Sequence, residues 1–193
     1  MRQILKSVFG VIALVAFCSG CVSYTPRVHS GHNFDQSKSY IYGRFNLAPR
    51  ANVLQMGLVV TSSDKKQTVT FKFEKEADPY VIAVNPGDYL INSLIFATGE
   101  GNKEGERPLY TAFSNRVFSV EAGKAYYIGD YEGGITRTFG ISSTPGQLIG
   151  FQNDWRLKST KNNFAVTTEL IETQIPFLKN IPKNNVFGDL LTK

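Results

Sequence analysis

The sequence predicts a mainly β fold: a single antiparallel β-sandwich of about eight or nine strands with one C-terminal helix, between residues 39 and 178. Apolar and polar residues alternate along most of this range, which is the period of a half-buried strand. Turn signals separate the alternating segments every eight to twelve residues or so, as sandwich folds require. After Lys158 the apolar spacing changes to three and four residues, which indicates a helix. An open barrel is the alternative architecture.

The chain begins with the features of an export signal. Arg2 and Lys6 precede an uninterrupted apolar run from Val8 to Phe17, and small residues follow it. This order matches the charged, apolar and cleavage regions of a signal peptide. The run has about ten residues, whereas a helix that crosses a bilayer needs roughly 18 or more. We therefore expect residues 1–20 to be a cleaved signal peptide and not a transmembrane anchor.

The end of this signal resembles the lipobox of bacterial lipoproteins. Ser19 and Gly20 stand where the motif has its two small residues, and Cys21 stands where it has the cysteine that becomes acylated. Cys18 occupies the position where the motif usually has leucine. An ordinary secretory signal followed by a chance cysteine is the alternative.

The resemblance implies a mature chain that begins at Cys21 and carries palmitate or similar acyl chains. More than one chain makes such an anchor stable, because a single acyl chain binds a membrane only marginally. Val22 follows the cysteine where aspartate could stand, and this resembles lipoproteins sent to the outer membrane of Gram-negative bacteria. The implied location is the cell envelope, with the membrane as a partner through the acyl chains.

The composition excludes several classes of protein. Cleavage before Cys21 leaves 173 residues, a typical size for one domain, with a net charge of +3 in place of +5. This mildly basic chain intersperses its cations with carboxylates, so we expect no nucleic-acid partner. Cys18 and Cys21 are the two cysteines, so the mature domain can form no disulfide, cysteine–zinc site or thiol nucleophile.

Residues 21–38 are predicted to be a flexible tether. They are rich in Ser, Thr, Pro, Gly, His and Asn without a period, so they bury too little apolar surface to offset their conformational entropy. His29 and His32, the two histidines of the chain, could share a zinc or copper ion, but no third ligand is evident and no metal site is predicted. The domain that follows has no histidine to act as the general base of a Ser-His-Asp hydrolase. We expect no cofactor.

Alternation predicts the first strands. In residues 40–47 one face is apolar, and Tyr40 and Tyr42 lie on the other, so a half-buried strand is expected. The same pattern recurs in residues 54–60 and 69–73. Three strands joined by short polar turns favour an antiparallel meander.

The next two strands, residues 80–84 and 89–96, flank the clearest turn signal of the chain. Between them lies Asn85-Pro86-Gly87-Asp88, in which proline presets the first central position and glycine can adopt a positive φ at the second. A type II turn is expected. A Pro-Gly-x-Tyr turn between two strands resembles transthyretin-like and related small β-sandwich modules of bacterial surface proteins, and this resemblance implies the same architecture.

Residues 99–108 are predicted to form an exposed loop, since they combine three glycines with five charged side chains. Loops at the ends of sandwiches often bind ligands. Calcium is one conceivable ligand, through Glu100, Glu104 and Glu106, although their spacing does not fit an EF-hand.

A second hairpin is predicted from residues 116–120 and 125–130, and further strands from residues 135–141 and 148–157. Asp130 and Glu132 would point to one side if the strand continues past the hairpin. Alternate residues of a strand lie about 6.5 to 7 Å apart, a spacing compatible with the paired carboxylates of glycosidases. An ordinary acidic turn before two glycines is the simpler interpretation.

Trp155 is the single tryptophan and lies among alternating apolar residues. It could stack on a sugar, but its place in the alternation favours packing in the core or at its rim.

A helix is predicted to start at Asn162 or Asn163 and to end near Gln174, before Pro176. Residues 179–193 are polar with scattered apolar residues and are expected to be a partly disordered tail. The apolar face of the helix and the turn after it comprises Phe164, Thr168, Ile171, Ile175 and Leu178.

These observations favour a lipid-anchored envelope lipoprotein that acts as a non-enzymatic binding or structural module. The alternative is a carbohydrate-active enzyme or lectin that uses Asp130, Glu132 and Trp155 on a glycan. A third possibility is an accessory subunit bound to an envelope protein partner, which an exposed apolar patch would indicate.

Overall fold

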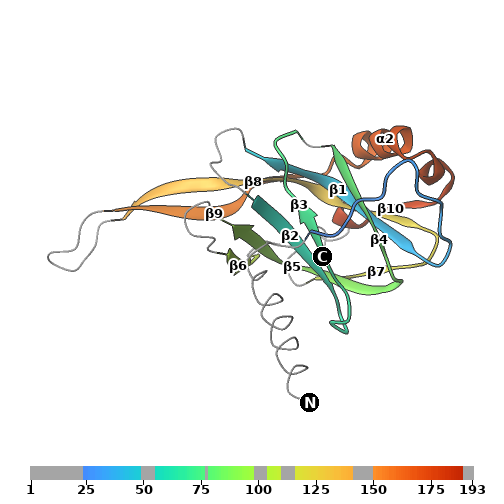
Figure 1. The fold of residues 1–193 in the computed structure, drawn as a ribbon, viewed down its shortest axis with the longest axis horizontal. Coiled ribbons are helices and arrows are strands. Elements are labelled where there is room, and N and C mark those ends of the chain that lie inside the picture. The colour runs from blue at the N-terminus through green and yellow to red at the C-terminus, as the bar shows by residue number, and fades with distance from the viewer. Residues whose placement is uncertain are drawn as a thin grey trace, which may run out of the picture.

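The computed structural model describes residues 24–48, 55–76, 78–97, 104–109, 116–140 and 150–188. These residues form two β-sheets that enclose one hydrophobic core, with one α-helix near the C-terminal end (Figure 1). The predicted mainly β sandwich with a C-terminal helix is confirmed.

The first sheet is mixed, whereas the sequence predicts a purely antiparallel fold. Its order is β10-β8-β1-β4, with β9 paired to β8. The β1–β8 and β10–β8 pairs are parallel, and the β1–β4 and β8–β9 pairs are antiparallel. The strands are β1 (Ser39–Leu47), β4 (Pro79–Val84), β8 (Ala125–Gly140), β9 (Gly150–Lys161) and β10 (Lys183–Asn185).

The second sheet is antiparallel throughout its described pairs. Its order is β3-β2-β5-β6, with β7 also paired to β5. The strands are β2 (Gln55–Ser62), β3 (Thr68–Lys72), β5 (Gly87–Ala97), β6 (Glu104–Pro108) and β7 (Val117–Val120).

Two predicted hairpins are wrong because their strands belong to different sheets. The turn at Asn85 and Pro86 leads from β4 in the first sheet to β5 in the second, and the turn after Val120 leads from β7 back to β8. The predicted meander of the first three strands is also wrong, because β1 lies in the first sheet and only β2 and β3 pair with each other. Gly87 does adopt a positive φ of 151°, but a type II turn places this residue near +80°.

Strand β1 is buried on both faces and not half-buried as predicted. Its second face is covered by α2 (Phe164–Gln174) and the 3₁₀ helix η1 (Pro176–Asn180). Tyr42 lies under α2, where its hydroxyl is 2.7 Å from the Thr168 hydroxyl. The ring of Tyr40 packs against Phe177 of η1, with centroids 5.5 Å apart. The sequence pattern assigns these tyrosines to the solvent face of the strand, because their hydroxyl groups are polar.

Phe45 of β1 is the centre of the aromatic core between the sheets. It is 2% exposed, stacks on Phe71 of β3 at 4.7 Å and on Tyr131 of β8 at 5.5 Å, and meets two further rings edge to face. Rings from both sheets therefore meet on one side chain, which holds the two layers together.

The predicted flexible tether is wrong for residues 24–38, which lie along the sandwich. The backbone N–H of Thr25 donates to Thr70 on β3, and that of Val28 donates to Val81 on β4. Val28 is buried. Composition alone missed this segment because backbone groups make its main contacts, and these do not depend on apolar side chains.

Helix α2 begins and ends where the sequence predicts. Asn163 occupies the N-cap position, but its side chain makes no cap hydrogen bond. The predicted disorder of the tail is wrong for residues 179–188, since β10 pairs with β8 and Phe187 is 1% exposed. Residues 189–193 lie outside the described part of the chain.

Strand β8 runs without interruption through the two glycines that suggested a turn. A Cβ at Gly133 would meet the Met56 sulfur at 2.5 Å, and one at Gly134 would meet Ala48 at 3.1 Å. Glycine is needed here for close packing and not for a chain reversal. Beyond this point β8 and β9 continue as a two-stranded ribbon that projects from the sandwich (Figure 1).

The predicted exposed loop 99–108 is wrong in its second half, because Glu104–Pro108 forms β6 on the edge of β5. Gly105 lies opposite Phe96, whose ring occupies the space that a Cβ would need. The first half of the predicted loop lies outside the described residues. Among the residues that are described, no helix is long and apolar enough to cross a membrane.

Candidate functional site

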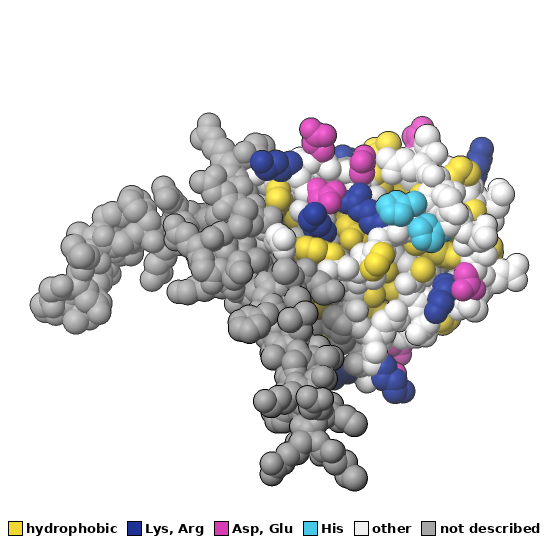
Figure 2. Space-filling view, in the orientation of Figure 1, with side chains coloured by type: hydrophobic (Ala, Val, Ile, Leu, Met, Phe, Trp, Pro, Cys, Tyr) yellow, Lys and Arg dark blue, Asp and Glu magenta, His cyan; other side chains and the backbone are white. Residues whose placement is uncertain are grey.

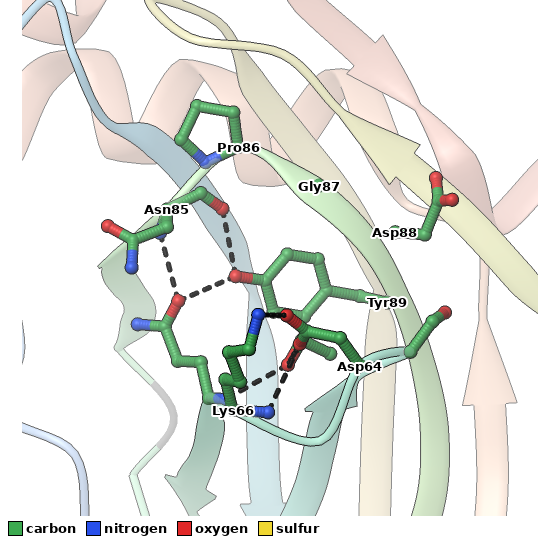
Figure 3. A pocket seen from close by; sticks show the side chains of 10 residues that line it. Asp64, Lys66, Asn85, Pro86, Gly87, Asp88 and Tyr89 are labelled. Atoms are coloured by element: carbon green, nitrogen blue, oxygen red, sulfur yellow. Dashed lines mark hydrogen bonds and ion pairs between the residues drawn. The ribbon is translucent and has the colours of Figure 1, made fainter.

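A polar pocket lies at one end of the sandwich, between the turn that joins β2 to β3 and the connection from β4 to β5 (Figure 3). Its volume is about 320 Å³. It is lined by Ser62, Ser63, Asp64, Lys66, Gln67, Asn85, Pro86, Gly87, Asp88 and Tyr89.

The turn on one side of the pocket is built around Asp64. Its Oδ1 accepts hydrogen bonds from the Ser62 hydroxyl at 2.7 Å and from the Lys66 backbone N–H at 3.1 Å. Short side chains that bond to nearby backbone N–H groups in this way stabilise tight turns. Lys65, which lies between Asp64 and Lys66 in this turn, has a positive φ of 59°.

A buried tyrosine joins the two sides of the pocket. The Tyr89 hydroxyl lies 2.6 Å from the Gln67 side-chain oxygen and 2.8 Å from the Asn85 carbonyl oxygen. The same Gln67 oxygen accepts the backbone N–H of Asn85 at 3.0 Å. Burial, and then the negative charge of Asp64, raise the pKa of Tyr89, so its hydroxyl stays protonated and donates at neutral pH. The turn and the connection are thus fixed relative to each other.

The rim of the pocket is charged and exposed. Hydrogen bonds from the Ser62 hydroxyl and the Lys66 backbone, with the Lys66 ammonium at 3.1 Å, lower the pKa of Asp64 to about 2. A carboxylate with such a low pKa is a weak proton acceptor at neutral pH. The rim of the pocket therefore presents charged groups that suit the binding of a polar or charged ligand.

The stability of the fold should depend on Asp64 in acid. Because the folded pKa lies below the ordinary value of 3.8, the contribution of this carboxylate is present above about pH 4 and is lost as the pH falls through about 2. We expect the wild type to lose stability in acid and Asp64→Asn to lose less. Melting temperatures of both proteins at pH 5 and pH 2 measure this. An unchanged difference between the two pH values would contradict the assignment.

Asp130, one of the predicted glycan ligands, is buried against the start of α2. It is 8% exposed, and its carboxylate accepts hydrogen bonds from the Asn163 amide at 3.0 Å and from the Thr167 hydroxyl at 3.1 Å. Glu132 is two residues further on the same strand and is partly exposed. These contacts give Asp130 a structural role: it ties β8 to the first turn of the helix.

Removing this carboxylate should destabilise the domain. In Asp130→Ala the hydroxyl of Thr167, a residue with no exposed surface, loses its acceptor, and a buried unsatisfied group costs about 1–3 kcal/mol. Glu132→Ala is the matched control, and we expect it to change the free energy of unfolding by less than about 0.5 kcal/mol. Urea denaturation compares them. Equal stability of Asp130→Ala and the wild type would favour a ligand-binding role.

The other predicted site residues are only partly placed. Trp155 lies in β9, with its backbone opposite Ile135 of β8, and its side chain is outside the described part of the chain, as is Cys21. The glycan hypothesis therefore stays a prediction. His29 and His32 are exposed neighbours with ring centroids 5.7 Å apart. No group of three potential metal ligands occurs among the described residues.

No pattern in the sequence indicates that the two segments that form the pocket lie together. Short polar turns are expected on both sides, and the structure has turn or bend residues at 63–66 and at Pro86, whereas residues 61–62 and 87–88 belong to β2 and β5. Their meeting depends on β4 and β5 lying in different sheets, which the turn signals do not encode. Gln67 and Tyr89, which link the segments, are indistinguishable in the sequence from other polar and aromatic strand residues.

No family model matches the chain, and no curated protein matches it.

Proposed function

We propose that this protein is a lipid-anchored lipoprotein of a bacterial cell envelope, whose β-sandwich is a non-enzymatic binding or structural module. The observation that carries the proposal is the order of residues at the N-terminus: a charged start, a short apolar run, Ser19, Gly20 and then Cys21. Acyl chains on Cys21 hold the domain at the membrane. Val22 after the cysteine favours the outer membrane.

The fold supports this proposal in two ways. Thr25, four residues after Cys21, is already hydrogen-bonded to Thr70 of β3, so only a short link joins the proposed anchor to the domain. The polar pocket at the far end of β2 and β3 offers carboxylates, amides and an ammonium group to a polar ligand. Hydrogen bonds from the Ser62 hydroxyl and the Lys66 backbone lower the pKa of Asp64 to about 2, so this carboxylate is ionised at neutral pH.

Acylation at Cys21 can be tested in growing cells with an alkyne analogue of palmitate. We expect the wild type and Cys18→Ser to incorporate the label, because both keep Cys21, and Cys21→Ser to incorporate none. Cys18→Ser is a matched control that changes a cysteine of the signal without touching the proposed acylation site. Label in Cys21→Ser, or its absence from the wild type, would contradict the proposal.

A further inference from the structure

The link between the proposed anchor and the folded domain is very short. Two residues, Val22 and Ser23, separate Cys21 from Tyr24, the first residue that the structure describes. Each residue spans at most about 3.6 Å, so the Cα atoms of Cys21 and Tyr24 lie no more than about 11 Å apart. A domain on such a link cannot stand far from the bilayer.

The segment that follows this link is hydrogen-bonded to the second sheet from Thr25 onward. Thr25 donates its backbone N–H to the Thr70 carbonyl at 3.2 Å, and its hydroxyl oxygen accepts the Thr70 N–H at 3.0 Å. The carbonyl of Thr25 accepts the Tyr80 hydroxyl at 2.7 Å. Thr25 is therefore held by β3 and β4 together and cannot swing away as a free tether would.

A second set of contacts fixes the segment to the first sheet. The Arg27 guanidinium lies 4.2 Å from the centre of the Tyr80 ring and forms an ion pair with Glu74. One residue later, the N–H of Val28 donates to Val81 on β4 at 2.9 Å. The segment thus bridges the edge strands of both sheets, and the point on the domain from which the link starts is set by the fold.

The residues next to the anchor suit a membrane surface. The Lys72 ammonium, at the end of β3, lies 5.7 Å from the centre of the Tyr24 ring. The Tyr24 hydroxyl is buried and its ring lies over Gly57 of β2, so the group that this corner offers to lipid is the Lys72 ammonium, which also lies 3.6 Å from Glu74. Lysine near a membrane surface is attracted to anionic lipids. Figure 2 shows basic, acidic and hydrophobic side chains interspersed on the face that carries the two histidines, His29 and His32.

We propose that the corner formed by Tyr24, Thr25 and Lys72 lies against the bilayer, with the polar pocket directed away from it. The turn with Asp64 and Lys66 is at the opposite end of β3, and five residues of strand separate Gln67 from Lys72, about 17 Å at 3.4 Å per residue. This orientation rests on the proposed acylation of Cys21. It presents the pocket to partners or ligands beyond the membrane surface.

Fluorophores attached to single cysteines test the orientation. The acylated protein has no free thiol once Cys21 is modified and Cys18 is removed, so Lys72→Cys and Lys66→Cys each give one labelling site. The labelled proteins are placed in phosphatidylethanolamine–phosphatidylglycerol vesicles that contain a lipid with a nitroxide headgroup. The two labels lie at opposite ends of one hairpin. We expect strong quenching at position 72, which the proposal places at the bilayer, and little at position 66, which it places away from the bilayer.

A longer link provides the matched control. Twelve Gly/Ser residues inserted between Ser23 and Tyr24 would span about 19 Å, and we expect them to reduce the quenching at position 72 toward that at position 66. Intact mass is measured on every sample. If Cys21 is acylated but the two positions are quenched equally, or the insertion has no effect, the orientation is wrong while the lipoprotein function stands. A mass without acyl groups would contradict both the orientation and the lipoprotein function.

Discussion

Gly43→Ala is expected to be among the most damaging single-methyl changes in the domain. A Cβ at this position would overlap the backbone carbonyl oxygen of Gly129 on the neighbouring parallel strand, and Phe45 closes the space at 3.3 Å. The β1–β8 register shifts between Tyr42 and Arg44, so Gly43 lies at an irregularity in the pairing of the two strands. A backbone group cannot move aside as a side-chain tip can. We expect a loss of about 3 kcal/mol or more in the free energy of unfolding.

Gly31→Ala is the matched control, because no atom lies within 4 Å of the added methyl group. We expect it to change the free energy of unfolding by less than about 0.5 kcal/mol. Chemical denaturation followed by tyrosine fluorescence or circular dichroism measures both variants. Similar stabilities of Gly43→Ala and Gly31→Ala would show that β1 and β8 do not approach as described.

Phe45→Ala should have a comparable or larger effect through the core. The phenyl ring is 2% exposed and touches rings from both sheets, so its removal leaves a cavity that the neighbouring strands cannot close. Such substitutions typically cost about 3–5 kcal/mol, a large part of the roughly 5–15 kcal/mol that stabilises a domain.

Val166→Ala serves as the control for Phe45→Ala. Val166 is 56% exposed on α2, so its truncation should shift the denaturation midpoint very little. A midpoint for Phe45→Ala close to that of Val166→Ala would mean that Phe45 is not the centre of the core.

Local patterns predicted the elements well, because alternation and helical spacing are set by neighbours in sequence. Strand β1 and helix α2 fall within one residue of their predicted starts. Pairing between distant segments is different: nothing near Pro86 or Val120 encodes that the chain crosses to the other sheet there. The parallel pairing of β8 with β1 and β10 likewise depends on residues far apart in the chain.

Composition led to wrong predictions where backbone groups or buried polar side chains make the contacts that hold the fold together. The segment that contains Thr25 and Val28 looks flexible by its side chains, yet its N–H groups complete the edges of two sheets. Asp130 looks like a ligand-binding carboxylate, but Asn163 and Thr167 approach it from a helix more than thirty positions later. The candidate pocket could not be predicted either, because its two turns are far apart in the sequence and meet only in the folded chain.

The most direct test of the lipoprotein proposal is the intact mass of the protein purified from native membranes, measured beside Cys21→Ser. We expect the wild type to have the mass of residues 21–193 plus a diacylglyceryl group and an N-linked acyl chain, and the variant to carry neither group. A wild-type mass without lipid, or cleavage at another bond, would contradict the lipid anchor and the orientation that depends on it.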